Sequence, residues 1–212
     1  MNKKIKAKLV YDRLIAKYPD VKCSLSFENP LQLMVATQLS AQCTDKRVNI
    51  VTPRLFEVFQ TASDFANSDI QELEKLIHST GFYKNKAKNI KEACKRIEEV
   101  FGGVVPKDMD NLLSLAGVGR KTANVVLAEG FDIPGMVIDT HVGRLSKRIG
   151  LTKNADPQKV EKDLMKLLPD SLWNKFGLLL IALGREICTS RNPKCINCLL
   201  CDVCDFCKTK TI

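Results

Sequence analysis

Cysteine spacing near the C-terminal end constrains this 212-residue chain more than any other feature of its sequence. Six of the nine cysteines fall within one short segment: Cys188, Cys195, Cys198, Cys201, Cys204 and Cys207. Gaps of two residues let neighbouring thiolates converge on one centre, as zinc and iron–sulfur sites require. Zinc sites usually take two Cys-x-x-Cys pairs separated by a longer loop, which these cysteines lack. The pattern therefore favours an iron–sulfur cluster and leaves open which four cysteines bind it.

The N-terminal segment and the hydropathy of the chain predict neither export nor membrane insertion. Met1–Lys4 is basic, but Lys6 and Lys8 interrupt the only apolar run that could complete a signal peptide. No stretch approaches the roughly 18 uncharged apolar residues that a membrane-spanning helix needs. We therefore expect an intracellular protein without a membrane partner, in which the cysteines serve metal binding or catalysis rather than disulfides.

The chain is basic, with 33 Lys and Arg residues against 24 Asp and Glu, a net charge of +9 and a pI near 9.1. Such an excess suits a polyanionic partner, because each neutralised phosphate releases condensed counterions and adds affinity that does not depend on sequence. Charge alone does not identify that partner, since many basic proteins bind no nucleic acid.

Hydrophobic periodicity predicts an all-α protein of about ten helices, with few strands or none. Capping residues, glycines and prolines mark where these helices begin and end. We expect helices over Ile5 to about Tyr18, Leu31 to about Leu39, Lys86–Val100 and Trp173–Ile187. A further helix should run from a capping box of Ser68 and Gln71 to Gly81. Other helices should begin at or near Pro53, after Asp108 and after Asp156–Pro157.

A glycine-bearing hairpin between two helices is predicted in the segment 108–127. Gly117 and Gly119 flank Val118, so the backbone can turn sharply and leave bare amide groups at the start of the second helix. That helix end carries partial positive charge and can hold a phosphate. The spacing excludes a Walker A loop, and the preceding helix excludes a dinucleotide-binding strand–turn–helix. An ordinary turn between helices remains the alternative for this segment alone.

Lys121 follows the hairpin directly and is a candidate nucleophile. An unprotonated ε-amine can attack a sugar carbon and form a Schiff base. We expect partial burial, Arg120 and the nearby helix N-terminus to favour the unprotonated form. A solvated or phosphate-contacting lysine is the alternative.

Asp139 and His141 lie 18 and 20 residues beyond Lys121. Asp139 could accept a proton, orient a water or stabilise a sugar cation, and it could equally cap the helix that follows; the two roles are compatible. A histidine in the position of His141 is more often packed or in contact with a phosphate than a general base.

Together these motifs resemble the endonuclease III family of helix-hairpin-helix DNA glycosylases. The resemblance rests on the hairpin residues 117–123, on Val137–Val142, and on a Cys-x6-Cys-x2-Cys-x5-Cys pattern met by Cys188, Cys195, Cys198 and Cys204. It extends to Leu39–Asp45 and Gly81–Ala87, so it covers nearly the whole chain in the order of the family.

The resemblance implies a bifunctional DNA glycosylase/abasic-site lyase of base excision repair that acts on oxidised pyrimidines in double-stranded DNA. Lys121 would attack the anomeric carbon of a flipped-out nucleoside and expel the base, Asp139 would activate the lysine or stabilise the sugar cation, and β-elimination would nick the strand. Gln42 would fill the vacated stack and Phe82 would wedge the opposite strand; without the resemblance they would be interpreted as a surface amide and a core aromatic. Further DNA contacts are expected from Gly117, Gly119, Arg120 and His141.

The resemblance also implies a 4Fe-4S cluster and a division into two helical domains flanking a DNA groove. Cys188, Cys195, Cys198 and Cys204 would hold the cluster, which shapes a loop over 188–204 whose Arg191 and Lys194 meet phosphates. One domain, residues 22–132, would be a six-helix barrel with the hairpin, and the other would join residues 1–21 to 133–212. We expect a monomer that is cytoplasmic and associated with the nucleoid.

Three departures from the family pattern affect these expectations. Ala116 stands where the hairpin usually has proline, which should loosen the turn without abolishing phosphate binding. Phe82 is bulkier than the leucine often found there. Cys201 and Cys207 are additional thiols that could complicate the ligand set.

Three other functions remain as alternatives to the glycosylase/lyase. An adenine glycosylase of the same superfamily would lack the hairpin lysine and have a long C-terminal domain. A glycosylase for pyrimidine dimers would share the motifs. A non-catalytic, zinc-containing DNA-binding module would leave Lys121 and Asp139 jointly unexplained.

Overall fold

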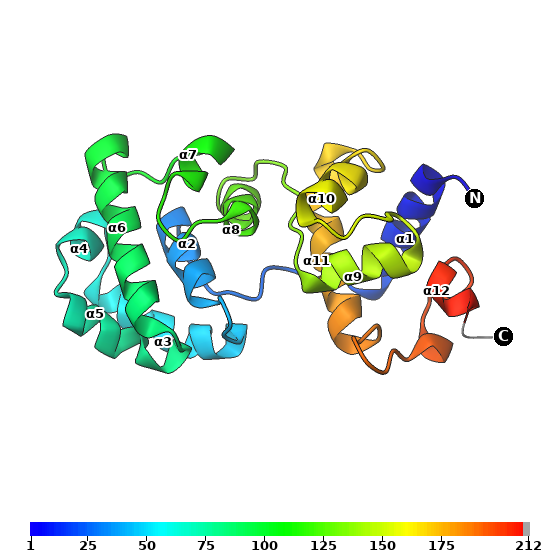
Figure 1. Ribbon diagram of the computed structural model, residues 1–212, viewed down its shortest axis with the longest axis horizontal. Coiled ribbons are helices and arrows are strands. Elements are labelled where there is room, and N and C mark those ends of the chain that lie inside the picture. Colours follow the sequence, from blue (N-terminus) through cyan, green and yellow to red (C-terminus); the bar gives the residue numbers. More distant parts are fainter. Residues whose placement is uncertain (210–212) are drawn as a thin grey trace. The chain divides into compact units, whose positions relative to one another are not determined.

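The computed structural model describes residues 1–209, and every regular element in that range is a helix (Figure 1). This confirms the all-α fold predicted from periodicity. The chain divides into two compact units. Cys23–Ile133 forms the continuous unit, and Met1–Lys22 together with Pro134–Ile212 forms the split unit. Within the described range, no helix combines the length and apolarity needed to cross a membrane.

The continuous unit is organised around α2, in which every residue from Leu33 to Leu39 is buried. Helix α6 is amphipathic and packs its apolar face against α4 and α5 (Figure 1). The elements of this unit are α2 (Pro30–Leu39), α3 (Asp45–Val58), α4 (Ala62–Asn67), α5 (Ile70–Ile77), η1 (His78–Thr80), α6 (Tyr83–Phe101), α7 (Met109–Leu113), α8 (Arg120–Val125) and the π-helical turn η2 (Val126–Gly130).

The split unit has its own core, in which α11 packs against both α9 and α1. Phe176, Leu179, Leu180 and Leu183 recur at helical spacing and give α11 the buried stripe that joins the N-terminal helix to the rest of the unit. The elements are α1 (Lys3–Lys17), α9 (Thr140–Ile149), α10 (Pro157–Met165), η3 (Asp170–Leu172), α11 (Trp173–Glu186), η4 (Cys195–Asn197) and α12 (Asp205–Lys208).

The helix start expected at Pro53 is wrong, because Pro53 lies inside α3. The helix begins at Asp45, where the Thr44 side chain caps it by accepting a hydrogen bond from Arg47 N over 3.2 Å. Val48 and Leu55 are buried on either side of the proline, so core packing holds the helix together across the hydrogen bond that the proline removes.

The other helix starts need two further corrections. Ser68 does not open a capping box: its hydroxyl donates back to Phe65 O, and Asp69 caps α5 by accepting from Gln71 N over 3.0 Å. Helix α6 begins at Tyr83, three residues before the expected Lys86. The first error arises because neighbouring polar residues can each serve as a cap, whereas the N-cap of α6 is Phe82, which makes no side-chain cap hydrogen bond.

Candidate functional site

The predicted hairpin is present as α7, a tight turn and α8. Gly117 has a φ of +72°, and a Cβ atom on it would lie 2.9 Å from Asn89 Cβ on α6. The backbone conformation and the close approach therefore both require glycine. Val118 is buried, and its N–H donates to Leu115 O over 3.1 Å, which anchors the turn to the core.

Lys121 lies in the first turn of α8 and is exposed, so the expectation of partial burial is wrong. The reason is helical geometry: Ala123 is buried on the core-facing side, and residues two positions apart point in nearly opposite directions. The first intrahelical bond runs from Ala123 N to Gly119 O over 2.9 Å, and Gly119 offers no capping side chain. Helix α8 therefore begins without a side-chain cap, as expected for a hairpin whose second helix follows a glycine.

Gln42 and Phe82 share an uncommon backbone conformation. Their φ values are +52° and +50°, in the left-handed region that non-glycine residues rarely adopt. Both residues are exposed, and Phe82 retains 64% of its accessible surface. The alternative of a core aromatic at Phe82 is therefore wrong.

A cavity of about 270 Å³ brings Gln42 and Phe82 together with the hairpin glycine Gly117. Gln38 also lines it and donates from Nε2 to Ala116 O over 3.3 Å. The carbonyl of Ala116, the residue in place of the usual proline, is thus held from α2. These residues all belong to the continuous unit.

Asp139 is the N-cap of α9, and its Oδ1 accepts a hydrogen bond from Val142 N over 2.8 Å. The capping role, one of the two considered from sequence, is therefore present. The side chain is half-buried, and its other carboxylate oxygen is not needed for the cap. The structure thus leaves Asp139 able to combine capping with chemistry.

His141 is half-buried and packed within the split unit. Its Nδ1 lies 3.1 Å from Arg144 Nη2, and a Cβ atom on Gly184 would come within 2.6 Å of the same ring nitrogen. Gly184 is therefore required by this packing, and the Nδ1 edge of the ring faces the protein.

Four thiols in the split unit are free: Cys188, Cys195, Cys198 and Cys204. Burial raises the pKa of Cys198, and charge on the other three thiols raises it further. All four cysteines pack in the same core of the split unit. Within residues 1–209, no three His, Cys, Asp or Glu side chains are arranged to hold a metal ion. The fit to a cluster is therefore tested by the chemistry of these thiols.

That chemistry suits thiolate ligands. Burial raises the pKa of Cys204, but backbone hydrogen bonds from Cys207 and Phe206 oppose the shift, and Leu200 does the same at Cys198. Hydrogen bonds to sulfur are a feature by which proteins stabilise and tune iron–sulfur clusters. A donor set of four free thiols, two of which (Cys198 and Cys204) accept such bonds, fits the chemistry of the cluster expected from the sequence.

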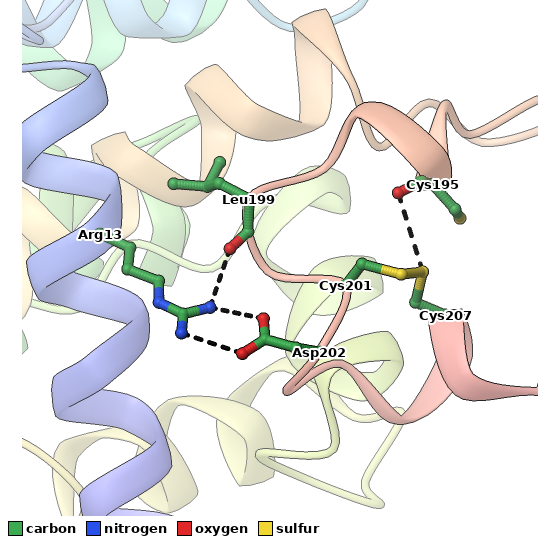
Figure 2. A network of polar contacts seen from close by, with 6 residues as sticks. All are labelled: Arg13, Cys195, Leu199, Cys201, Asp202 and Cys207. Carbon is green, nitrogen blue, oxygen red and sulfur yellow. Dashed lines mark hydrogen bonds and ion pairs between the residues drawn. A yellow bond between two sulfur atoms is a disulfide. The ribbon is translucent and has the colours of Figure 1, made fainter.

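The two remaining thiols of the segment, Cys201 and Cys207, form a disulfide, which corrects the expectation that the cysteines serve only metal binding or catalysis (Figure 2). Their Cα atoms are 5.2 Å apart, within the range that a disulfide can bridge. Figure 2 also shows Arg13 of α1 donating to Asp202 from both terminal nitrogens, over 2.5 and 2.9 Å, and to Leu199 O. The disulfide crosslinks two residues of the cysteine segment, and the ion pair joins that segment to α1.

The loop between Cys188 and Cys195 exposes both basic residues expected to meet phosphates. Arg191 and Lys194 are solvent-accessible. The loop is closed by Lys194 N, which donates to Ile187 O over 3.0 Å, and by Thr189 Oγ1, which donates to Asn192 O over 2.8 Å.

Comparison with known proteins gives a consistent result. The family model for HhH-GPD superfamily base excision DNA repair proteins matches residues 35–170. Endonuclease III of Synechocystis sp. is 56% identical over 182 residues, which cover 85% of this chain and 83% of the relative. A solved non-covalent endonuclease III–DNA complex superposes with a TM-score of 0.94 at 41% identity, covering 100% of this chain and 99% of the other. A trapped endonuclease III–DNA covalent intermediate has the same TM-score and identity, with complete coverage of both chains.

The chain belongs to the endonuclease III family of the HhH-GPD superfamily.

Membership in the endonuclease III family confirms several expectations at once. The chain is a base excision repair enzyme of the bifunctional glycosylase/lyase class, it acts on DNA, and its all-helical fold is that of the family. The candidate residues divide between the two units. Lys121 lies in the continuous unit with Gln42, Phe82 and the hairpin, whereas Asp139, His141 and the thiols lie in the split unit.

Sequence reasoning did not identify two charged residues that the structure places beside the endonuclease III motifs. Lys86 is buried and lines the same cavity as Gln42 and Phe82, and Arg148 donates a hydrogen bond to the thiol of Cys188. Lys86 occurs in a block that matches the family, but only its burial, which no local pattern reveals, distinguishes it from the other lysines of α6. Helix η2 was missed as well, since no sequence signal marks a π-helical turn.

Proposed function

We propose that this chain excises oxidised pyrimidines from double-stranded DNA and nicks the strand through a Schiff base on Lys121. The observation that supports this most is the exposed amine of Lys121 at the start of α8, beside a hairpin that only glycine can form. The Nζ atom attacks C1′ of the flipped-out nucleoside, and the C1′–N bond to the damaged base breaks. Ring opening leaves a protonated imine, and loss of a C2′ proton then breaks the C3′–O bond.

Asp139 has two roles in this proposal. One oxygen caps α9, and the other accepts a proton from the lysine or stabilises the developing positive charge on the sugar. Fixing the carboxylate through the cap reduces its rotational freedom, so the free oxygen is already oriented before substrate binds.

DNA is held and opened by residues of both units. The amides of the hairpin at Gly117 and Gly119, with Arg120, contact phosphates of the damaged strand. Gln42 fills the space left by the flipped nucleotide and Phe82 wedges into the opposite strand, because an exposed aromatic can insert between stacked bases. His141, Arg191 and Lys194 supply further contacts to the backbone.

Cys188, Cys195, Cys198 and Cys204 are the residues that would hold a 4Fe-4S cluster. When bound, the cluster would crosslink the segment that presents Arg191 and Lys194, a structural contribution rather than a redox step in the reaction. We also propose that the continuous unit is the six-helix barrel of the family, and that the protein acts as a monomer on chromosomal DNA in the cytoplasm.

The test is borohydride trapping on a duplex that contains one thymine glycol, with a second duplex that contains an abasic site. Wild-type protein should give a covalent adduct with both duplexes. Lys121→Ala should bind both but trap neither, with a loss of at least roughly 10³-fold in nicking. Lys75→Ala, which removes an exposed lysine of α5, is the matched control and should trap normally.

Each other outcome has a distinct meaning. Equal trapping by Lys121→Ala would overturn the nucleophile assignment. Trapping by wild type on the abasic duplex alone would overturn the substrate class and leave the lyase step standing.

A further inference from the structure

Lys86 is almost completely buried, with 6% of its surface exposed, although it lies near the start of a basic helix. Its ammonium donates to two backbone carbonyls, Leu39 O over 2.7 Å and Thr80 O over 2.9 Å. Burying an ammonium is unfavourable unless its donors are satisfied, so these two bonds account for its position.

Each of the two carbonyls belongs to the last residue of a helix, and each helix is followed closely by a residue proposed to enter DNA. Leu39 is the last residue of α2, three positions before Gln42. Thr80 is the last residue of η1, two positions before Phe82. Carbonyls at a helix C-terminus lack intrahelical partners and attract a cation. One ammonium therefore satisfies the ends of two separate helices.

The backbone of Lys86 acts on the same segment as its side chain. Its N–H donates to Phe82 O over 3.1 Å. Both Gln42 and Phe82 have positive φ values, a conformation that persists in non-glycine residues only where the surroundings impose it. Lys86 binds directly to the segment that precedes Gln42 and to the segment that precedes Phe82. The side chains of Gln42, Phe82 and Lys86 also line the same cavity of about 270 Å³.

We propose that Lys86 is a positioning residue that fixes Gln42 and Phe82 relative to each other, so that the two enter the duplex as one unit. The proposal rests on the function proposed above for Gln42 and Phe82, and it adds the element that couples them. Without the ammonium, the carbonyls of Leu39 and Thr80 lose their shared partner, and the two loops can move independently.

The test compares substrates that need strand opening with one that does not. Lys86→Met keeps the length and apolar stem of the side chain but removes the donors. On duplex DNA with a thymine glycol we expect at least a 20-fold loss in the single-turnover rate. On a single-stranded oligonucleotide with an abasic site we expect borohydride trapping within 3-fold of wild type, because no base needs to be displaced.

Lys91→Met is the matched control. Lys91 lies on the same helix, and its Nζ also donates to a backbone carbonyl, that of Ser68, which follows α4 and leads to neither Gln42 nor Phe82. We expect this variant to retain the wild-type ratio of duplex to single-strand activity. A 2-aminopurine opposite the lesion gives a direct readout: its fluorescence should rise on binding of wild type and Lys91→Met, and rise far less with Lys86→Met.

The outcomes separate this inference from the proposed function. If Lys86→Met shows the wild-type ratio and the wild-type fluorescence change, the coupling role is wrong. An equal loss on duplex and single strand, with wild-type folding by circular dichroism, would also overturn it, since Lys86 would then support the chemistry in general. If the wild type traps neither substrate, the proposed function itself fails.

Discussion

Arg148 donates a hydrogen bond from Nη1 to the Sγ atom of Cys188 over 3.3 Å. The same guanidinium donates to Thr189 O over 2.7 Å and to Ser190 O over 2.8 Å, and it lies 4.6 Å from the centre of the Phe206 ring. One side chain of α9 thus binds a thiol, the loop that follows it and an aromatic of α12. In the proposed cluster, Arg148 would both place Cys188 and put a positive charge beside its thiolate.

Removing that guanidinium should weaken retention of the cluster. We expect Arg148→Gln to bind the cluster at least about 10-fold less tightly, because groups that orient a ligand typically contribute that much. The measurement is the loss of visible absorption during titration with an iron chelator. Lys147→Gln, which changes an exposed neighbour on the same helix, should behave as wild type. Indistinguishable chelation curves for the two variants would contradict the assignment.

The disulfide separates the six clustered cysteines into two sets. Cys198→Ala should abolish the visible absorption of the purified protein, because it removes one of the four free thiols. The double substitution Cys201→Ser with Cys207→Ser should keep it, since these sulfurs are bonded to each other. Iron analysis alongside the spectra checks both. A colourless double variant would show that the family pattern alone does not define the ligands in this chain, and a wild type rich in zinc would overturn the cluster.

Cys94 on α6 should make the protein less stable in alkali. Burial raises the pKa of its thiol from 9.0 to about 12, and Glu98 adds to the shift. Between those values the unfolded chain has lost a proton that the folded chain keeps. The free energy of unfolding should therefore fall as the pH rises from about 9 to about 12. Below pH 9 both states keep the proton, so this thiol causes no change of stability with pH.

Comparison with Cys94→Ala isolates this effect. The variant should be about 1 kcal/mol less stable than wild type at pH 7, because it loses a buried sulfur. The difference should shrink as the pH rises above 9. Denaturant unfolding at pH 7, 9 and 10.5 measures both; a constant difference would show that Cys94 ionises as easily in the folded state as in the unfolded state.

Local signals in the sequence predicted those parts of the structure that depend on neighbouring residues. Asp108 and Asp156 cap the helices they were expected to cap, and Gly117 forms the turn, because each interaction is completed within a few residues. Pro53 was misplaced because its helix is held by burial of Val48 and Leu55, which no local rule reports.

For the candidate site as well, sequence predicted the features set by nearby residues and not those set by packing between distant segments. Spacing singled out the six clustered cysteines, and only the family resemblance chose four of them as cluster ligands, a choice that stays a prediction. The exposure of Phe82 was expected from the family resemblance alone. The burial of Lys86 was not foreseen, because it depends on how the segment around residue 82 packs against the end of α2. The Cys201–Cys207 disulfide likewise depends on the path of the chain between the two residues.

Asp139 allows its two roles to be separated by substitution. Asparagine is as good an N-cap as aspartate, so Asp139→Asn should keep the bond to Val142 N and leave the free energy of unfolding within about 0.5 kcal/mol of wild type. It cannot accept a proton or stabilise a cation with a full negative charge. We therefore expect single-turnover excision to slow by roughly 10²–10⁴-fold.

Asp156→Asn supplies the matched control, because Asp156 caps α10 in the same way, accepting from Lys159 N over 2.9 Å. It should change neither stability nor turnover. Asp139→Ala should lose the cap as well as the charge, and so combine slow excision with a loss of about 1 kcal/mol in stability. Wild-type turnover by Asp139→Asn would reduce Asp139 to a helix cap, since only the carboxylate charge distinguishes the two side chains at this position.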